Sequence, residues 1–236
     1  MARTVNKEDH AAKRGEILQA AQRLISSKGY ERMTIQDILH ELGMSNGAFF
    51  HYFESKPAVL EALIEQIRTE TEKQMLPLVH DPNLSGLEKL QGFFDTLDQL
   101  RIAHKAEVVE LGRVWYADEN ALVRLKVDAA VLKQRAPLLT EIVRQGVREG
   151  VFTLSHPEQS GEVILALLHG MGNTHAEVLF AFVETLDEQR CIDRIVTTHA
   201  AYMDAIERVL GAPPNSLYRA DAEAVKVWLT ALRPKA

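Results

Sequence analysis

Apolar residues recur every three or four positions along almost the whole chain, and this spacing restricts the fold to helices. It predicts helices over residues 9–28, 34–42, 45–53, 55–75, 84–104, 106–115, 120–149, 157–182, 188–210 and 220–232. No stretch alternates apolar and polar residues as a half-buried strand does, and glycine or proline marks the main junctions, including an expected break at Pro77. We therefore expect an all-α protein.

Length and cysteine content narrow the class further. With 236 residues the chain can bury a large core and form one or two domains. Cys191 is the only cysteine, which excludes an intramolecular disulfide and a cysteine metal cluster. The charged N-terminus lacks the apolar segment of a secretory signal, and the longest uncharged apolar run, residues 163–176, is shorter than the ~20 residues that span a bilayer. These features predict a cytoplasmic protein with no membrane partner.

Charge is distributed unevenly along the chain. Residues 1–56 carry 8 Lys and Arg against 7 Asp and Glu, whereas residues 57–236 carry 19 against 26. An acidic protein with a weakly basic end fits sequence-directed DNA binding by a small head better than the coating of nucleic acid by a basic surface.

The stretch from Thr34 to Lys56 is predicted to form two short helices that meet at a glycine. Thr34 is expected to cap the first helix in a capping box with Asp37. Gly43 ends that helix, because glycine reaches the left-handed backbone conformation without steric cost, and Ser45 is expected to cap the next one. With the helix at residues 9–28, this corner predicts a three-helix unit containing a helix-turn-helix.

The second helix of the corner has two different sides. Phe49 and Phe53, four residues apart, are expected to pack back on the first helix. This arrangement turns the small and polar residues outward, namely Asn46, Gly47, Ala48, His51 and Tyr52. Small residues at an exposed helix start allow a close approach to a large surface, so the corner is a candidate DNA-binding element.

Several dispersed motifs strengthen that interpretation. Residues 17–24 read ILQAAQRL, residues 29–30 read GY, Thr34 opens a helix, residues 43–45 read GMS, and residues 47–56 read GAFFHYFESK. On these residues, roughly the first 60 positions resemble the TetR family of bacterial transcriptional repressors. The rest of the chain shows a weaker likeness, in its helix count and in the RQGVREGVF close of a long helix at residues 144–152.

The resemblance implies a DNA-binding domain over residues 1–56 and a helical effector-binding and dimerisation domain over residues 57–236. It implies a homodimer that places the helix at residues 45–52 in the major groove of a near-palindromic operator. A small, largely apolar effector would release such a repressor from double-stranded DNA. The positions that would lie at or near the DNA are Thr34, Ser45, Asn46, Gly47, Ala48, Phe50, His51, Tyr52 and Lys56.

Within that set, the resemblance assigns Thr34 and Lys56 to phosphate contacts. Phe50 departs from the family pattern, because the family usually has a tyrosine there whose hydroxyl meets a phosphate. Whether the Tyr52 hydroxyl compensates is left open. Bases are read through donors and acceptors, so contact of Ala48 with a thymine methyl group is expected to carry part of the specificity.

Polar and aromatic residues set in apolar helices are candidates for an effector cavity. Such residues are most often satisfied core or interface residues, and the alternative stays open for each of them. Taken together, and because the resemblance places a small-molecule pocket among the middle helices, the candidates are Phe93, Phe94, His104, Trp115, Tyr116, His169, Asn173 and His175. Gly161, Gly170 and Gly172, with the apolar stripe at residues 192–210, look like the family's dimer seam.

Two sequence features suggest an enzyme, but neither has the context that catalysis requires. Residues 43–47 read Gly-Met-Ser-Asn-Gly, which matches the nucleophile elbow of serine hydrolases, but the elbow requires a preceding strand and the residues here are helix-periodic. The nine histidines are never three or four apart, so no single helix offers two metal ligands on one face. We expect no catalytic residue, metal or cofactor. A helical enzyme or ligand carrier that retains the corner only for packing is the alternative.

Overall fold

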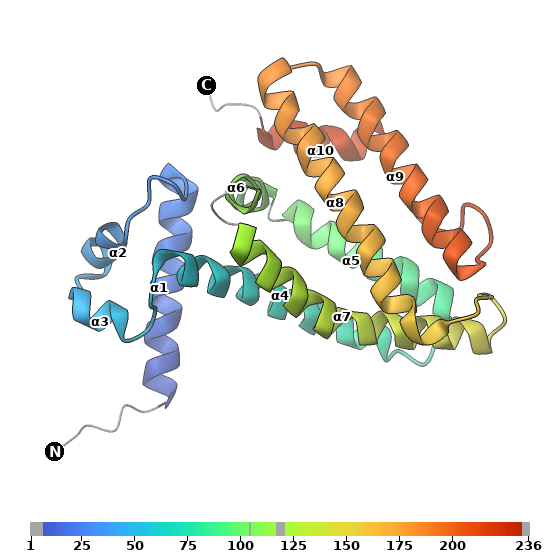
Figure 1. Cartoon of the computed structure of the whole chain (residues 1–236), viewed down its shortest axis with the longest axis horizontal. Coiled ribbons are helices and arrows are strands. Elements are labelled where there is room, and N and C mark those ends of the chain that lie inside the picture. Colours follow the sequence, from blue (N-terminus) through green and yellow to red (C-terminus); the bar gives the residue numbers. More distant parts are fainter. Residues whose placement is uncertain (1–6, 104, 117–120, 233–236) are drawn as a thin grey trace. The chain divides into compact units, whose positions relative to one another are not determined.

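The computed structural model describes residues 7–103, 105–116 and 121–232, and every regular element within these ranges is helical (Figure 1). This confirms the all-α prediction. The α-helices are α1 (Lys7–Lys28), α2 (Ile35–Leu42), α3 (Asn46–Phe50), α4 (Lys56–Val79), α5 (Gly86–Ala103), α6 (Lys105–Trp115), α7 (Ala121–Arg148), α8 (Ser160–Thr185), α9 (Glu188–Leu210) and α10 (Ala222–Leu232). A short 3-10 helix, η2 (Pro157–Gln159), precedes α8.

The expected break at Pro77 is wrong, because α4 continues through this proline to Val79. A proline inside a helix removes one backbone hydrogen bond and disfavours the preceding turn. Here Met75 and Val79, on either side of Pro77, are 0% and 1% exposed. Burial of these two side chains therefore holds the last turn of α4 in place despite the proline.

The chain forms two compact units, each described here by itself. The first comprises residues up to Thr69 together with Glu107–Val127, and the second comprises Glu70–Ala106 and the residues from Asp128 onward. The boundary expected after Lys56 thus differs from the division of the structure, because α4 is one continuous helix that contributes residues to both units. The assignment of functions to the two parts remains a prediction.

The first unit is held together by side chains from four helices. Ile17 of α1, Ile38 of α2, Phe49 of α3 and Leu60 of α4 are at most 1% exposed and belong to one apolar cluster. With 8 and 5 residues, α2 and α3 are too short to be stable alone. Their conformation therefore depends on this shared core.

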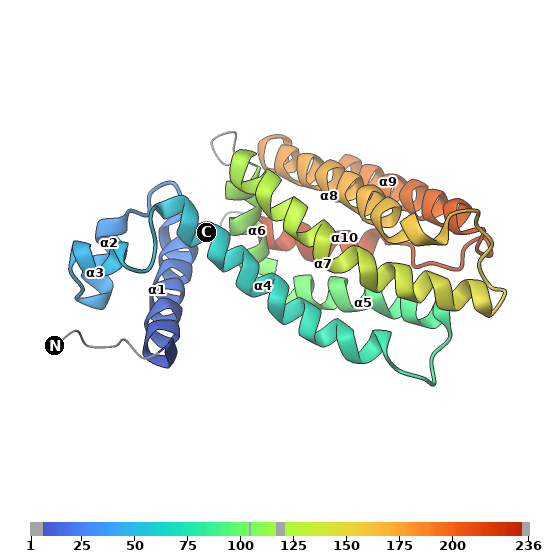
Figure 2. The same ribbon diagram turned by 60° about the horizontal axis from the view of Figure 1, so that its bottom comes forward.

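The second unit is a helical bundle in which α8 and α9 lie side by side in both views (Figures 1 and 2). Its core combines Phe93 of α5, Leu139 of α7, Ile164 of α8 and Ile206 of α9, all 0% exposed. The apolar stripe of α9 is buried within the same chain.

The glycines of α8 serve different purposes. A Cβ at Gly161 would collide with the Ala136 carbonyl of α7, and one at Gly170 would lie 2.9 Å from the Tyr202 hydroxyl of α9. These two glycines therefore permit close packing inside one chain. At Gly172, by contrast, an added Cβ would meet open space.

No helix in the described ranges has the length and apolar character needed to cross a membrane. Within the same ranges, no three His, Cys, Asp or Glu side chains are grouped so that they could hold a metal ion.

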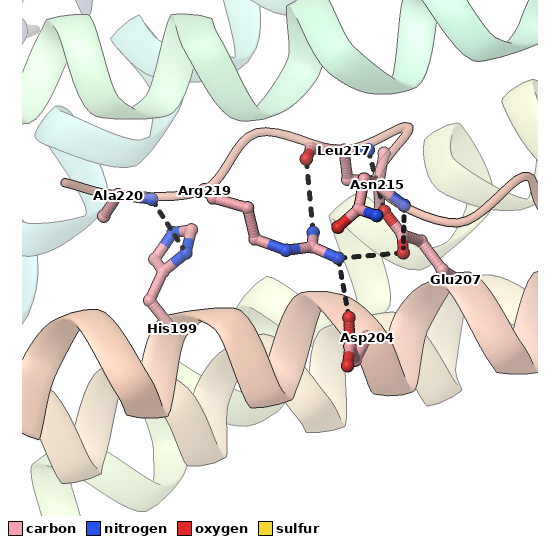
Figure 3. Close-up of polar contacts among 7 residues, drawn as sticks. All are labelled: His199, Asp204, Glu207, Asn215, Leu217, Arg219 and Ala220. Atoms are coloured by element: carbon pink, nitrogen blue, oxygen red, sulfur yellow. Dashed lines mark hydrogen bonds and ion pairs between the residues drawn. The ribbon is translucent and has the colours of Figure 1, made fainter.

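A buried carboxylate fixes the loop between α9 and α10 (Figure 3). The Glu207 carboxylate, 5% exposed, accepts hydrogen bonds from the backbone amides of Asn215 (3.0 Å) and Leu217 (2.9 Å) and from the Arg219 guanidinium (2.8 Å). Burial by itself would raise the pKa of Glu207, but the hydrogen bonds from Arg219, Leu217 and Asn215 lower it below the usual value. Glu207 is therefore ionised at neutral pH and ties the loop to α9.

Replacement of Glu207 by Ala is expected to lower the free energy of unfolding by about 2–4 kcal/mol, because it leaves the Asn215 and Leu217 amides without their acceptor and removes one partner of the half-buried Arg219 guanidinium. Asp204 is the matched control, since its carboxylate binds the same Arg219 guanidinium at 2.7 Å but is 51% exposed. Asp204→Ala should cost less than about 1 kcal/mol. Urea unfolding of both variants checks the difference, and equal losses would contradict the role assigned to Glu207.

Candidate functional site

The turn between α2 and α3 has the local geometry that the sequence predicts. Gly43 adopts a left-handed conformation with φ of 59°, and its amide bonds back to the last turn of α2. Ser45 caps α3, since its hydroxyl accepts a hydrogen bond from the Ala48 amide at 3.3 Å. Because Ser45 follows a helix and serves as a cap, the Gly-x-Ser-x-Gly sequence here is not a nucleophile elbow.

The two sides of α3 differ as predicted. Phe49 is 0% exposed and points into the core of the first unit. On the opposite side, Ser45, Asn46, Gly47, Ala48 and the following His51 are all exposed.

Gly47 and Phe50 stand out on the exposed side. A Cβ at Gly47 would meet open space, so no neighbour in the chain requires a glycine there. Phe50 is 48% exposed, which is unusual for a large apolar ring. This side of α3 therefore presents a small backbone surface beside an uncovered aromatic ring.

Tyr52 lies differently from its expected outward position. The helix ends at Phe50, so His51 and Tyr52 belong to the turn that follows. Tyr52 is half-buried against the core of the first unit, and its ring centroid lies 4.7 Å from that of His10 in α1. The wrong expectation arose from extending regular helical spacing past the end of a five-residue helix.

Thr34 and Lys56, the expected phosphate contacts, already have partners inside the chain. The Thr34 hydroxyl accepts from the Asp37 amide at 3.2 Å and the Thr34 amide donates to the Asp37 carboxylate at 2.7 Å, which completes the predicted capping box. The Thr34 hydroxyl also donates to that carboxylate at 2.7 Å. Lys56 donates to the Glu31 carbonyl at 3.2 Å, and its ammonium lies 4.1 Å from the Tyr30 ring centroid. Hydrogen bonds from Lys28 and Thr34 lower the pKa of Asp37 to about 2.

Several cations of the first unit are paired with acidic side chains on the surface. These ion pairs are Lys13 with Glu16 at 2.6 Å, Arg23 with Glu41 at 2.7 Å, and Lys28 with Asp37 at 2.6 Å. The pairing partly neutralises the weakly basic end of the chain.

The predicted effector residues fall in different surroundings. Phe93 and Phe94 are buried in the core of the second unit, while His104 lies outside the described residues. Trp115 and Tyr116 belong to the first unit, where the guanidinium groups of Arg68 and Arg124 lie 5.9 and 5.8 Å from their respective ring centroids.

The α8 candidates all lie in the second unit. His169 is exposed and its Nε2 lies 3.7 Å from an Asp128 carboxylate oxygen, and Asn173 is half-buried. The ring of His175 stacks on that of His199 in α9, with centroids 5.9 Å apart. Within the described structure the buried Nε2 of His175 has no hydrogen-bond partner.

His199 also belongs to this cluster, although the sequence pattern did not predict it as a site residue. Its Nδ1 accepts the Ala220 amide at 3.3 Å, and the Tyr218 ring meets it edge-on (Figure 3 shows the Ala220 bond). The sequence feature that could have indicated His199 is its place in the apolar stripe of α9, four residues after Ile195 and four before Met203. Such a position is usually filled by an apolar residue.

Both stacked histidines are uncharged in the folded chain at neutral pH. Burial, with smaller contributions from His199 and Arg101, lowers the pKa of His175 from 6.5 to about 4. Burial and the nearby Arg219 lower the pKa of His199 to about 4. The cluster is thus a pair of neutral imidazoles inside an apolar bundle.

Stability should therefore fall as the pH is lowered from about 6.5 towards 4. In that window the unfolded chain binds protons at these histidines and the folded chain does not, which costs up to about 1.4 kcal/mol per pH unit for each ring. Urea unfolding at pH 7, 6 and 5 measures the slope. His175→Phe should reduce it, the exposed His156→Ala should leave it unchanged, and a flat profile between pH 7 and 5 would contradict the burial of neutral imidazoles.

Comparison with known proteins adds to this geometry. Residues 17–63 match the family model described as bacterial regulatory proteins of the tetR family, and residues 111–180 match a tetracyclin repressor-like C-terminal domain. The chain is 26% identical over 145 residues to the HTH-type transcriptional repressor KstR2 of Mycobacterium tuberculosis, covering 60% of this chain and 70% of the relative. It is 42% identical over 67 residues to the repressor Rv1474c of the same organism, covering 28% and 34%.

A solved structure shows the same fold. A TetR-family transcriptional regulator from Pectobacterium atrosepticum superposes with a TM-score of 0.63 at 16% identity, covering 88% of this chain and 99% of the regulator. The helix-turn-helix geometry, both family models and these relatives agree. The chain is a DNA-binding transcriptional regulator of the TetR family.

Proposed function

We propose that this regulator acts in the cytoplasm as a homodimeric repressor that reads a near-palindromic operator with α3 and the turn that follows it. The observation that carries the proposal is the two-sided character of α3, in which Phe49 is fully buried while Ser45, Asn46, Gly47 and Ala48 are exposed. A short helix that is packed on the core by one face and exposed on the other can enter a major groove without rearrangement.

The exposed residues have distinct roles in this proposal. The Asn46 amide offers both a donor and an acceptor to base edges, and the His51 ring and Ser45 hydroxyl add further polar atoms. Ala48 contacts a thymine methyl group. Gly47 lets the backbone approach the DNA closely, which agrees with the open space around it.

Phosphate contacts are fewer than the family pattern implies. Phe50 has no hydroxyl, and the Thr34 hydroxyl proton is already donated to Asp37. Lys56 carries a positive charge, which Thr34 and Phe50 do not. Lys56 is therefore the residue of this set best suited to a phosphate contact.

The dimer seam in this proposal uses the outer face of α8. Gly161 and Gly170 are occupied by contacts within the chain, but an added Cβ at Gly172 would meet open space. A partner helix can approach closely at Gly172, and a near-palindromic operator offers the two copies successive major grooves about 34 Å apart.

A small, largely apolar effector would bind in the second unit and favour a conformer that no longer matches the operator. His175 and Asn173 remain candidates for the polar contacts of that effector. Mass spectrometry of a co-purifying molecule would identify it. Because coupling is reciprocal, the molecule should bind DNA-bound protein more weakly by the factor with which it weakens DNA binding.

DNA recognition is tested by anisotropy titration with fragments from upstream of the chain's own gene. Asn46→Ala should change the preference among operator variants by about 1–3 kcal/mol at the base pair that Asn46 contacts. Lys56→Ala should instead weaken binding to all sequences by the same factor and reduce the slope of log affinity against log salt concentration by ~1. If Asn46→Ala weakened every sequence equally, Asn46 would not read a base. Absence of binding to any double-stranded fragment at low salt would contradict the whole proposal.

The seam is tested by Gly172→Leu. Within one chain the larger side chain would extend into open space, so helix content and the unfolding temperature should be kept. A leucine at a close helix approach should block pairing, which sedimentation equilibrium would detect as the mass of one chain, together with loss of operator affinity. A variant that remains dimeric and binds the operator normally would remove Gly172 from the seam.

A further inference from the structure

The N-terminal end of α1 makes contacts that the family comparison and the proposed function do not use. The His10 ring centroid lies 4.7 Å from that of Tyr52 and 5.6 Å from that of His51. The His51 and Tyr52 rings meet edge-on at 5.3 Å. His10 precedes His51 by 41 residues and Tyr52 by 42, yet the three rings form one cluster. This cluster lies at the end of residues 45–52, the DNA-contacting segment of the proposed function.

A second contact joins the same two parts of the chain. The Arg14 guanidinium lies 4.6 Å from the ring centroid of Phe53. Because His10 and Arg14 are four residues apart, both project from one side of α1. That side of α1 contacts the end of the DNA-contacting segment and the residue after it at two successive helical turns, through Tyr52 and Phe53.

The beginning of α1 contributes little to the core. Residues 9–16 are all described, and none of their side chains is buried, whereas Ile17 and Leu18 directly after them are. Two helical turns that bury no side chain gain little stability from packing in the core. Their side chains instead contact residues 51–53, since His10 meets His51 and Tyr52 and Arg14 meets Phe53.

The DNA-contacting segment needs contacts from outside itself to hold its conformation. The helix α3 has 5 residues, includes Gly47, and stops before His51 and Tyr52. From the inside it is fixed by Phe49 and Phe53, which are 0% and 3% exposed. From the outside, among the described side chains, His10 is the one whose ring meets both Tyr52 and His51.

We propose that the first two turns of α1 form a brace for the DNA-contacting segment, with His10 as its positioning residue. The His10 ring packs on Tyr52 and holds the turn after α3 in the conformation that presents His51 to DNA. The inference rests on the proposed function, since it assumes that residues 45–52 contact the operator. It assigns His10 no contact with DNA of its own.

The test compares His10→Ala with His10→Phe in the full-length chain. Phenylalanine keeps an aromatic ring for Tyr52 and removes both imidazole nitrogens. An aromatic contact of this kind corresponds to about a three- to tenfold change in equilibrium constant. We expect His10→Ala to weaken operator binding about three- to tenfold with an unchanged salt slope, and His10→Phe to stay within about twofold of the wild type.

Hydrogen exchange in the absence of DNA gives a second readout. The Tyr52 amide donates to the Phe49 carbonyl at 2.8 Å, and its exchange reports whether the turn is held. Exchange should be faster in His10→Ala and unchanged in His10→Phe. His40→Ala, a substitution of an exposed histidine on α2, is the matched control and should alter neither exchange nor binding.

Three results would overturn the brace. They are wild-type exchange and binding in His10→Ala, failure of His10→Phe to restore both, and a salt slope reduced by ~1 in His10→Ala, which would mean a direct phosphate contact. Failure of the proposed function would look different. In that case the wild type and His40→Ala would bind no operator, while exchange at Tyr52 would still decide whether His10 holds the turn.

Discussion

Burial of Phe49 is the interaction on which the DNA-binding part of this chain depends. A helix of five residues has too few backbone hydrogen bonds to be stable by itself, so its orientation is set by the one side chain that enters the core fully. Ile17, Ile38 and Leu60 bring three other helices to the same core. The exposed face of α3 follows from this arrangement, because a side chain fixed on one side of a short helix leaves the other side bare.

The second unit combines an apolar bundle with a few polar groups whose hydrogen bonds determine where its elements lie. Glu207 gathers two amides and a guanidinium from the loop before α10, and His199 accepts a third amide from the end of that loop. These contacts add directional constraints to a core of otherwise interchangeable apolar side chains. His175 differs from them, since its buried Nε2 has no partner among the described residues.

Features that depend on neighbouring residues could be predicted from the sequence, and features that depend on distant residues could not. The capping box of Thr34 and Asp37 and the left-handed Gly43 follow from local chemistry, and the structure confirms both. Pro77 was expected to end α4, but burial of Met75 and Val79 overrides its local effect. The packing of Gly161 on α7, the half-buried position of Tyr52 and its contact with His10 all require knowledge of which helices meet. The sites predicted for DNA and effector remain predictions, because residue type alone does not show which exposed groups meet a partner.

The surface ion pairs of the first unit bear on how such a regulator would find its target. Lys13, Arg23 and Lys28 each face a carboxylate within 2.7 Å, so much of the positive charge near α1 and α2 is compensated before DNA arrives. Attraction to duplex of arbitrary sequence comes mainly from uncompensated cations. On the proposed function, this charge balance would shorten the time that the protein spends on DNA of arbitrary sequence, and its residence on an operator would depend on the fit of α3.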